Sequence, residues 1–127
     1  MTHPFRAAVE ARDIEAIRAT LAEDVLFFSP VAFQPFQGRD VVTEVLGNVM
    51  EVFGDFAYID DLAGDGTHAL VFRTSVNGKA VEGLDHLILD DDGHITRLTV
   101  MLRPLSGVIA MAEEMGPRVA HLPKAAT

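Results

Sequence analysis

The sequence predicts an α+β protein in which an antiparallel sheet packs against helices. Apolar residues recur at helical spacing from residue 40 to residue 53, which predicts a long amphipathic helix. Between residues 56 and 102, apolar stretches alternate with turns, among them Asn77-Gly78, a favoured two-residue hairpin turn. Each stretch has one strongly apolar face, as expected for strands of a curved sheet that packs against helices.

Two short helices are expected before the long one. Pro4 suits the first turn of a helix, and Ala8 follows it at helical spacing with other apolar residues. Asp13 can cap a second helix that carries Ile17 and Leu21 on one stripe. A short strand is expected over residues 25–28.

The segment 29–38 is predicted to be a loop, because it contains Pro30 and Pro35. It also contains Phe33 and Phe36, two large apolar side chains. We therefore expect the loop to fold inward, either as a lid or wall of a pocket or as ordinary core packing.

The C-terminal part is expected to contain four strands and a last helix. The strands cover about 56–63 and 67–76, and then two apolar runs within 81–102 that flank the turn at residues 90–93. Ser106 can cap a helix over about 106–116, which Gly116-Pro117 should end. Residues 120–127 have little to bury, so a mobile tail is expected. The chain 1–127 is interpreted as one domain with its core at about 3–104.

Composition excludes several classes of function. The 127 residues carry a formal net charge of −9, which argues against a nucleic-acid binder and against binding to acidic membranes. Cysteine is absent, so disulfides, thiol nucleophiles and thiolate metal sites are excluded. The first residues contain no long hydrophobic stretch of the kind that directs secretion or spans a membrane. A cytoplasmic location is the default expectation.

Motifs for metals, nucleotides and nucleophiles are missing. The five histidines show no zinc-like spacing, and the acidic turn at residues 90–93 lacks the alternating ligands of a calcium loop. No serine has the context of a nucleophile elbow, and no glycine-rich phosphate loop follows a strand. We therefore expect neither a metal nor another cofactor.

Asp85 is the strongest candidate for a functional residue. If residues 81–90 form a strand, Asp85 lies mid-strand on the same face as Val81, Gly83 and Leu87. A carboxyl group among apolar neighbours has a perturbed pKa, a property that functional sites use but that structural networks also show. His86 points to the opposite face, so the two residues do not form a dyad, and we expect His86 at a subunit interface.

Four short motifs, in this order, resemble a known family. They are Leu-Ala-Glu-Asp-Val (21–25), Phe-Gln-Gly-Arg-Asp (36–40), Gly-Leu-Asp-His-Leu (83–87) and Asp-Asp-Gly-His-Ile (91–95). Together they resemble the SnoaL-like branch of the nuclear transport factor 2-like superfamily, from Phe5 to about Leu102. The resemblance implies a cone-shaped barrel: a strongly curved antiparallel sheet wraps around three N-terminal helices, an additional C-terminal helix follows, and a deep apolar pocket remains. It also implies a homodimer that forms through the outer face of the sheet.

Within that superfamily, residues 84–87 look like the strand of ketosteroid isomerase that carries its oxyanion-hole aspartate, a carboxylic acid that stays protonated and donates a hydrogen bond. Asp85 takes that position. The position of the proton-shuttling aspartate is occupied by Ser29, and that of the oxyanion tyrosine by Phe5. Serine is too weak a base and phenylalanine donates no hydrogen bond, so steroid isomerisation by the same mechanism is not expected.

Other residues can be assigned to the pocket only as candidates. The polar candidates are Ser29, Tyr58, His68 and Thr74, and strict alternation favours His68 and Thr74 because they share a face with Leu70 and Phe72. The expected apolar lining is Phe5, Phe27, Phe33, Phe53, Phe72, Leu87, Leu98, Val100 and Leu102.

Three functions remain open at this stage. The first is an enzyme of the isomerase, cyclase or hydrolase type, in which Asp85 acts as an acid on a hydrophobic carbonyl or cyclic compound. The second is a module that binds a small apolar molecule without catalysis, because the expected base and tyrosine are missing. The third is a dimeric interaction protein whose cone is filled by its own side chains.

Overall fold

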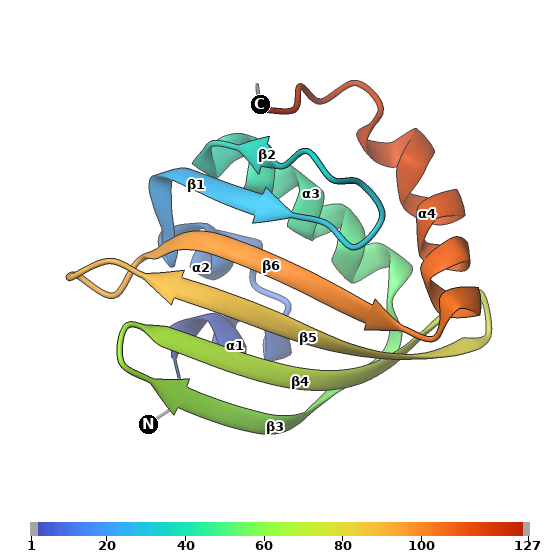
Figure 1. Cartoon of the computed structure of the whole chain (residues 1–127), viewed down its shortest axis with the longest axis horizontal. Coiled ribbons are helices and arrows are strands. Elements are labelled where there is room, and N and C mark those ends of the chain that lie inside the picture. Colours follow the sequence, from blue (N-terminus) through green and yellow to red (C-terminus); the bar gives the residue numbers. More distant parts are fainter. Residues whose placement is uncertain (1–2, 126–127) are drawn as a thin grey trace.

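The computed structural model describes residues 3–125, which form four helices and six strands. Figure 1 shows their arrangement. Their bounds are α1 (Pro4–Glu10), α2 (Ile14–Ala19), β1 (Leu21–Phe28), β2 (Phe36–Gln37), α3 (Arg39–Val52), β3 (Gly54–Gly64), β4 (Thr67–Val76), β5 (Lys79–Leu89), β6 (Ile95–Arg103) and α4 (Leu105–Val119).

The six strands form one curved sheet in the order β2-β1-β6-β5-β4-β3. All neighbours are antiparallel except β1 and β6, which pair in parallel. Helices α1, α2 and α3 lie against one face of the sheet, and α4 stands across one end of it (Figure 1). The α+β cone predicted from the sequence is confirmed, with a sheet that is mostly rather than entirely antiparallel.

The N-terminal helices form as predicted, with one shift of boundary. Asp13 caps α2, because its side chain accepts a hydrogen bond from the backbone N–H of Ala16. The helix ends at Ala19, however, and Leu21 opens β1 instead of extending the helical stripe. Leu21 is still fully buried, so its apolar character predicted burial correctly but not the type of element.

Helix α4 departs from the prediction at both ends. Pro104 occupies the N-cap position, and Ser106 lies inside the helix without a capping role. At the other end, Gly116-Pro117 does not stop the helix, which continues to Val119. Met111 and Met115 are buried as the helical spacing predicted, and they bring this helix onto the open end of the cone.

Strand β5 alternates between a buried and a half-exposed face as predicted. Val81, Gly83, Asp85 and Leu87 are buried, and the residues between them are partly exposed. Gly83 cannot carry a side chain here, because an added Cβ would lie 2.2 Å from Cζ of Phe72 on β4. The absence of a side chain at this position lets the ring of Phe72 pack against the backbone of β5.

The chain after α4 folds back over the molecule. Ala125 N–H donates a hydrogen bond to the carbonyl oxygen of Pro35 (2.7 Å), and Leu122 packs against the core. As expected for a tail with little to bury, residues 120, 121, 123 and 124 are exposed, and only Leu122 and Ala125 are partly buried; residues 126 and 127 lie outside the described part. Among residues 3–125, no helix combines the length and the apolar character needed to cross a membrane.

Candidate functional site

A cavity of about 840 Å³ lies between the inner face of the sheet and helices α3 and α4. Its volume falls within the usual range for small-molecule sites, roughly 300 to 1,000 Å³. Most of its wall is aromatic or aliphatic, and Asp85 is among the few polar groups that line it. The alternative of a cone filled by its own side chains is therefore wrong.

Asp85 and Tyr58 form a buried pair in the wall of this cavity. Asp85 lies on β5 and Tyr58 on β3, and the phenol O–H donates a hydrogen bond to Oδ2 of Asp85 (3.2 Å). Asp85 is 7% exposed and Tyr58 8% exposed. The pair leaves the second carboxyl oxygen of Asp85 without a hydrogen-bond partner among the described residues, so this oxygen can serve a ligand.

Burial sets the protonation state of this pair. Loss of solvation raises the pKa of Asp85 from 3.8 to about 7, and the hydrogen bond from Tyr58 opposes the rise because it stabilises the carboxylate. Burial, with a further contribution from the Asp85 carboxylate, raises the pKa of Tyr58 well above its usual range. Near neutral pH, Tyr58 is therefore a permanent donor, and Asp85 can both give and accept a proton.

The aromatic residues around Tyr58 fix its orientation. Phe56 meets the Tyr58 ring edge-on with 4.8 Å between ring centroids, and Phe72 does so at 6.3 Å. Phe53 stacks on Phe56 at 5.8 Å. These rings come from the end of α3 and from strands β3 and β4, so three elements hold the phenol in place.

The tyrosine that serves Asp85 is not at the position the resemblance implied. Phe5, on α1, is buried and lines the cavity, but it has no donor. Instead, Tyr58 reaches Asp85 from β3, which lies two strands away from β5 in the sheet. The Asp85–Tyr58 pair thus supplies a phenolic donor that the comparison of positions with ketosteroid isomerase had missed.

Ser29 lines the cavity as predicted, but its hydroxyl is engaged locally. Its Oγ accepts hydrogen bonds from the backbone N–H groups of Ala32 (3.1 Å) and Val31 (3.4 Å). It therefore stabilises the turn that follows β1. Nothing in this arrangement turns the serine into a base.

Two of the predicted polar residues lie outside the cavity. His68 is buried, but its Nε2 forms a hydrogen bond with Oδ1 of Asp61, which Arg6 also contacts. Thr74 donates a hydrogen bond to the carbonyl oxygen of Gly54 (2.8 Å). Both residues are on the inner, buried face of β4, as alternation predicted, but neither lines the cavity. Their assignment to the pocket was wrong.

The predicted apolar lining is correct for about half of its members. The residues that do line the cavity are Phe5, Phe27, Phe53, Phe72 and Val100. Leu87 and Leu98 are fully buried between sheet and helices, and Leu102 packs partly buried against the core, so none of the three reaches the cavity. Phe33 is 91% exposed, so the prediction of an inward-facing Phe33 was wrong, although Phe36 of the same loop is buried and lines the cavity.

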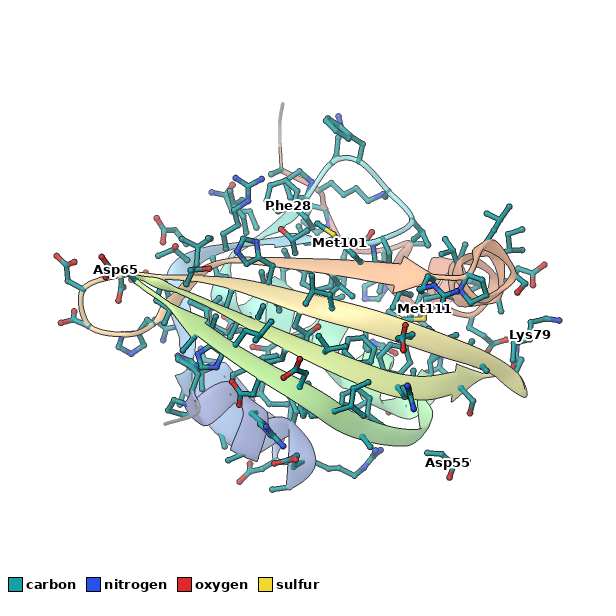
Figure 2. All side chains as sticks on the ribbon, turned by 60° about the horizontal axis from the view of Figure 1, so that its bottom comes forward. Phe28, Asp55, Asp65, Lys79, Met101 and Met111 are labelled. Atoms are coloured by element: carbon teal, nitrogen blue, oxygen red, sulfur yellow. The ribbon has the colours of Figure 1, made fainter. Side chains whose placement is uncertain are left out.

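Charged residues border the cavity at its exposed mouth. Glu10 and Arg12 approach from the end of α1, Asp55 from the start of β3, and Lys124 from the segment after α4. All four are exposed, and Figure 2 shows the Asp55 side chain standing away from the sheet. Asp85 is therefore the only buried carboxyl group that lines the cavity within residues 3–125.

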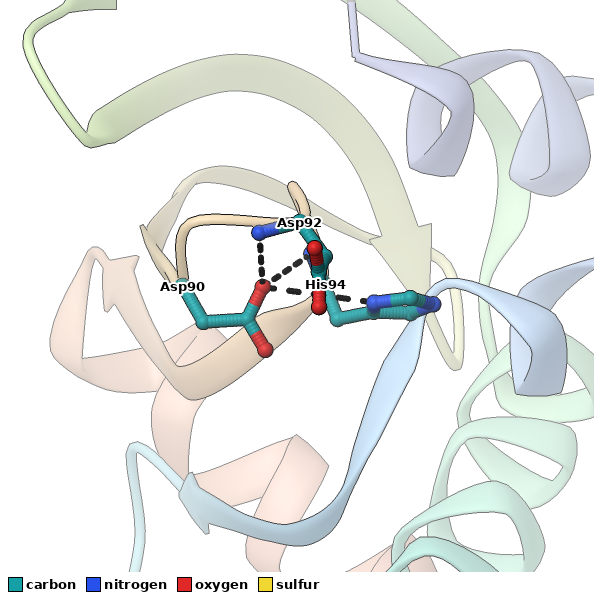
Figure 3. Close-up of side chains that lie close together, drawn as sticks. All are labelled: Asp90, Asp92 and His94. Atoms are coloured by element: carbon teal, nitrogen blue, oxygen red, sulfur yellow. Dashed lines mark hydrogen bonds and ion pairs between the residues drawn. The ribbon is translucent and has the colours of Figure 1, made fainter.

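The acidic turn between β5 and β6 brings three possible metal ligands together. Atoms of Asp90, Asp92 and His94 lie within 4.8 Å of one another, and all three residues are exposed (Figure 3). Oδ1 of Asp90 already accepts hydrogen bonds from the N–H groups of Asp92 and His94, both at 2.9 Å. This carboxylate closes the turn, as expected for a solvated hairpin.

The outer face of the sheet carries a row of apolar side chains. Val71, Leu84 and Met101 are register partners on β4, β5 and β6, and Met101 is 54% exposed (Figure 2). His86 lies on the same face, half-buried, with Nε2 2.8 Å from Oγ1 of Thr67. The opposite directions predicted for Asp85 and His86 are thus confirmed.

Sequence reasoning missed the contribution of the C-terminal part to the cavity. Met111 and Met115 of α4 line it, and so do Leu122 and Lys124 beyond the helix. The helical spacing of Met111 and Met115 was a usable signal, because it predicts that this side of α4 packs against the rest of the protein. The position of Lys124 had no comparable signal, since it depends on how the chain continues after α4.

Comparisons with known proteins agree with this fold. The family model described as SnoaL-like domain matches residues 3–98. A steroid delta-isomerase from Pseudomonas aeruginosa is 40% identical, with a TM-score of 0.86 over 91% of this chain and 86% of that one. An uncharacterised protein with a cystatin-like fold from Silicibacter pomeroyi is 34% identical, with a TM-score of 0.88 over 93% of this chain and 84% of that one.

A more distant structure shows the same architecture. An NTF2-like protein of unknown function from Cytophaga hutchinsonii is 23% identical, with a TM-score of 0.61 over 80% of this chain and 85% of that one. At this identity the similarity shows the fold alone. Among curated proteins, none matches the chain.

Proposed function

Because the chain belongs to the SnoaL-like domain family, we propose that it is an enzyme that binds an apolar cyclic carbonyl compound and activates the carbonyl group with Asp85. The single observation that carries this proposal is the buried Asp85–Tyr58 pair in the wall of a large apolar cavity. The 40% identical structure is that of a steroid delta-isomerase, which supports an apolar ring compound as the substrate.

The chemistry follows from the protonation of Asp85. When protonated, its carboxyl group donates a hydrogen bond to the carbonyl oxygen of the substrate, while Tyr58 stabilises the negative charge that remains on Asp85 as the proton moves toward that oxygen. A pKa of about 7 permits proton transfer in both directions near neutral pH. The aromatic walls bind the rings of the substrate and exclude water.

A second candidate is a binding protein without catalysis. It is favoured by the lack of a second buried carboxyl group in the cavity, since Ser29 is engaged in its turn and Glu10 and Asp55 are exposed. In that case the Asp85–Tyr58 pair would only select ligands that carry a hydrogen-bond acceptor. The two candidates differ in whether bound ligand exchanges protons.

Proton exchange in 2-tetralone, a two-ring ketone, distinguishes the two candidates. The protein is expected to bind the ketone and to accelerate exchange of the hydrogens next to the carbonyl for deuterium in D₂O, followed by NMR. Asp85 gives its proton to the carbonyl oxygen while a solvent molecule that enters through the mouth of the cavity removes the α-hydrogen, and the reverse steps return a deuteron to that carbon. Asp85→Asn should slow the exchange about 10² to 10⁴-fold, the usual contribution of a general acid. Asp91→Asn, a matched change in the exposed turn, should leave the rate unchanged.

Binding of 2-tetralone without accelerated exchange would favour the non-catalytic candidate. Accelerated exchange that survives Asp85→Asn would remove Asp85 from the role proposed here. Calorimetry on the same samples reports binding independently of exchange, so loss of binding and loss of catalysis are measured separately.

The outer face of the sheet supports a second proposal, that two copies of the chain form a homodimer through it. The apolar row of Val71, Leu84 and Met101 runs across three strands and is bordered by Arg73 and Arg103, which both contact Glu82. In a two-fold dimer, this row would pack against the same row of the second copy, and the charged residues would lie at the rim of the interface. His86 would lie near that rim.

Sedimentation velocity tests the dimer. The chain is expected to sediment at twice the monomer mass, and Met101→Lys should raise the dissociation constant at least about tenfold, because an unpaired buried charge costs several kcal/mol. Ile109→Lys, on the exposed side of α4, is the matched control. A monomeric wild type, or equal effects of the two variants, would contradict the dimer.

A further inference from the structure

The mouth of the cavity contains a lysine without an acidic partner. Lys124 lines the cavity, and among the described residues no carboxylate lies within salt-bridge distance of its ammonium group. Its only close partner there is the ring of Phe36, with 5.6 Å between Nζ and the ring centroid. Phe36 lines the same cavity.

Half of the ten basic residues form an ion pair with a carboxylate among the described residues, and Lys124 belongs to the other half. The sequence has 19 acidic and 10 basic residues, so carboxylates are abundant. The arginines that form ion pairs with aspartate or glutamate are Arg6, Arg18, Arg73, Arg103 and Arg118. A lysine that stays unpaired at the entrance of an apolar cavity is therefore available for a group on the ligand.

Local structure holds Lys124 in this place. The next residue, Ala125, donates its backbone N–H to Pro35, and Leu122 on the other side packs against the core. These two contacts fix the segment across the loop that precedes β2. The ammonium group thus lies beside Phe36, on the exposed side of the segment.

The second cation at the mouth is less available. Nη2 of Arg12 donates a hydrogen bond to the carbonyl oxygen of Met50 (3.2 Å), and the acidic Glu10 borders the cavity on the same side. The acidic groups Glu10 and Asp55 belong to α1 and β3, whereas Lys124 lies beside β2 at the other edge of the sheet. The acidic groups therefore lie on one side of the mouth, and the positive charge of Lys124 lies on the other.

Lys124 and Asp85 lie at different ends of the cavity. Asp85 is on β5 and Phe36 on β2, and these strands are three positions apart in the sheet. Neighbouring strands are about 4.8 Å apart, so the two strands are separated by about 14 Å across the sheet. A skeleton of two or three fused rings spans such a distance.

We propose that the ligand of this cavity is an amphipathic acid: an apolar ring compound whose carbonyl group meets Asp85 and whose carboxylate or other anionic group binds Lys124. This inference rests on the proposed function and names the class of its substrate. Lys124 is then a specificity-determining residue, because it distinguishes acidic ring compounds from neutral ones of the same shape.

Two fluorescent probes test the proposal. 1-Anilinonaphthalene-8-sulfonate is an apolar anion, and N-phenyl-1-naphthylamine is the same ring system without the sulfonate. Both should bind, and 2-tetralone should displace both, which places them in the cavity. Lys124→Met keeps an apolar side chain but removes the charge; it should weaken binding of the sulfonate about threefold to fivefold, the effect of one exposed ion pair. Binding of the neutral probe should stay unchanged.

Lys79→Met is the matched control, because Lys79 is an exposed lysine at the start of β5 that does not line the cavity. It should change neither affinity. If both probes bind but Lys124→Met leaves their affinity ratio unchanged, or Lys79→Met lowers it equally, this inference is wrong and the proposed function stands. If neither probe nor 2-tetralone binds, the proposed function itself is wrong.

Discussion

Replacing Asp85 with asparagine is expected to raise the free energy of unfolding at pH 8 by about 2 to 4 kcal/mol. The folded protein holds the pKa of Asp85 at about 7, against 3.8 for the free side chain. Between these two values the unfolded chain loses its proton while the folded chain keeps it, so stability falls as pH rises. Above pH 7 stability has fallen by its full amount. Asparagine cannot ionise, so the variant avoids this loss of stability.

The stability difference between Asp85→Asn and wild type should depend on pH. Below about pH 4, Asp85 is protonated in both states, so the asparagine variant should have no advantage there. Urea denaturation of both proteins from pH 4 to pH 8 measures the difference, which should grow with pH and level off above 7. Asp91→Asn should shift stability by less than about 0.5 kcal/mol at every pH, as expected for a surface substitution. A variant that is less stable than wild type at pH 8 would contradict the raised pKa.

Replacing Phe72 with alanine is expected to lower the free energy of unfolding by about 3 to 5 kcal/mol, the usual cost of removing a buried phenylalanine. Phe72 is 1% exposed and packs against Phe53, Phe56 and Tyr58, with ring centroids 5.6, 5.0 and 6.3 Å away. It also fills the space that Gly83 leaves open. Denaturation at pH 5, where Asp85 is mostly protonated, isolates the packing effect.

Phe33→Ala provides the matched comparison, because Phe33 is 91% exposed. It should change stability by no more than about 0.5 kcal/mol. The pair of variants therefore tests the distinction between the two phenylalanines, both of which the sequence assigned to the pocket. Equal losses in the two variants would show that the loop before β2 packs inward after all.

Alternation along the strands predicted the inner face of the sheet. In β5 the sequence placed Val81, Gly83, Asp85 and Leu87 on one side, and all four are buried. Alternation is reliable here because β5 pairs on both sides in an uninterrupted register around Asp85. Alternation also placed Asp85 and His86 on opposite faces of β5. The sequence therefore predicted that a single buried acid forms the candidate site.

The partner of Asp85 was not predictable in the same way. Tyr58 is the only tyrosine in the chain and was among the candidates, but its strand has register shifts next to it, between Ala57 and Gly54 and between Tyr58 and Asp60. Each such irregularity changes which side chains face inward, so alternation alone cannot align β3 with β5. His68 and Thr74 were assigned to the cavity for another reason: alternation on β4 predicted their face correctly, but it does not predict which part of that face the cavity touches.

The predicted C-terminal end of α4 was wrong for a different reason. Glycine followed by proline is a strong local signal for the end of a helix, but α4 continues through Pro117 to Val119. Val119 and Met115 both contact the apolar cavity wall, and this tertiary packing outweighs the local preference. The segment beyond it, with Leu122 and Lys124, is placed by contacts with the loop before β2 that no local pattern encodes.

The measurement that tests the central claim most directly is a titration of the Asp85 carboxyl carbon by ¹³C NMR. Comparison with Asp85→Asn identifies its signal. We expect the carboxyl group to titrate with a pKa of about 7, because it is buried beside Tyr58 in an apolar cavity. A pKa near 4, the ordinary value of a solvated aspartate, would contradict the account of Asp85 as a buried acid that is ready to protonate a ligand.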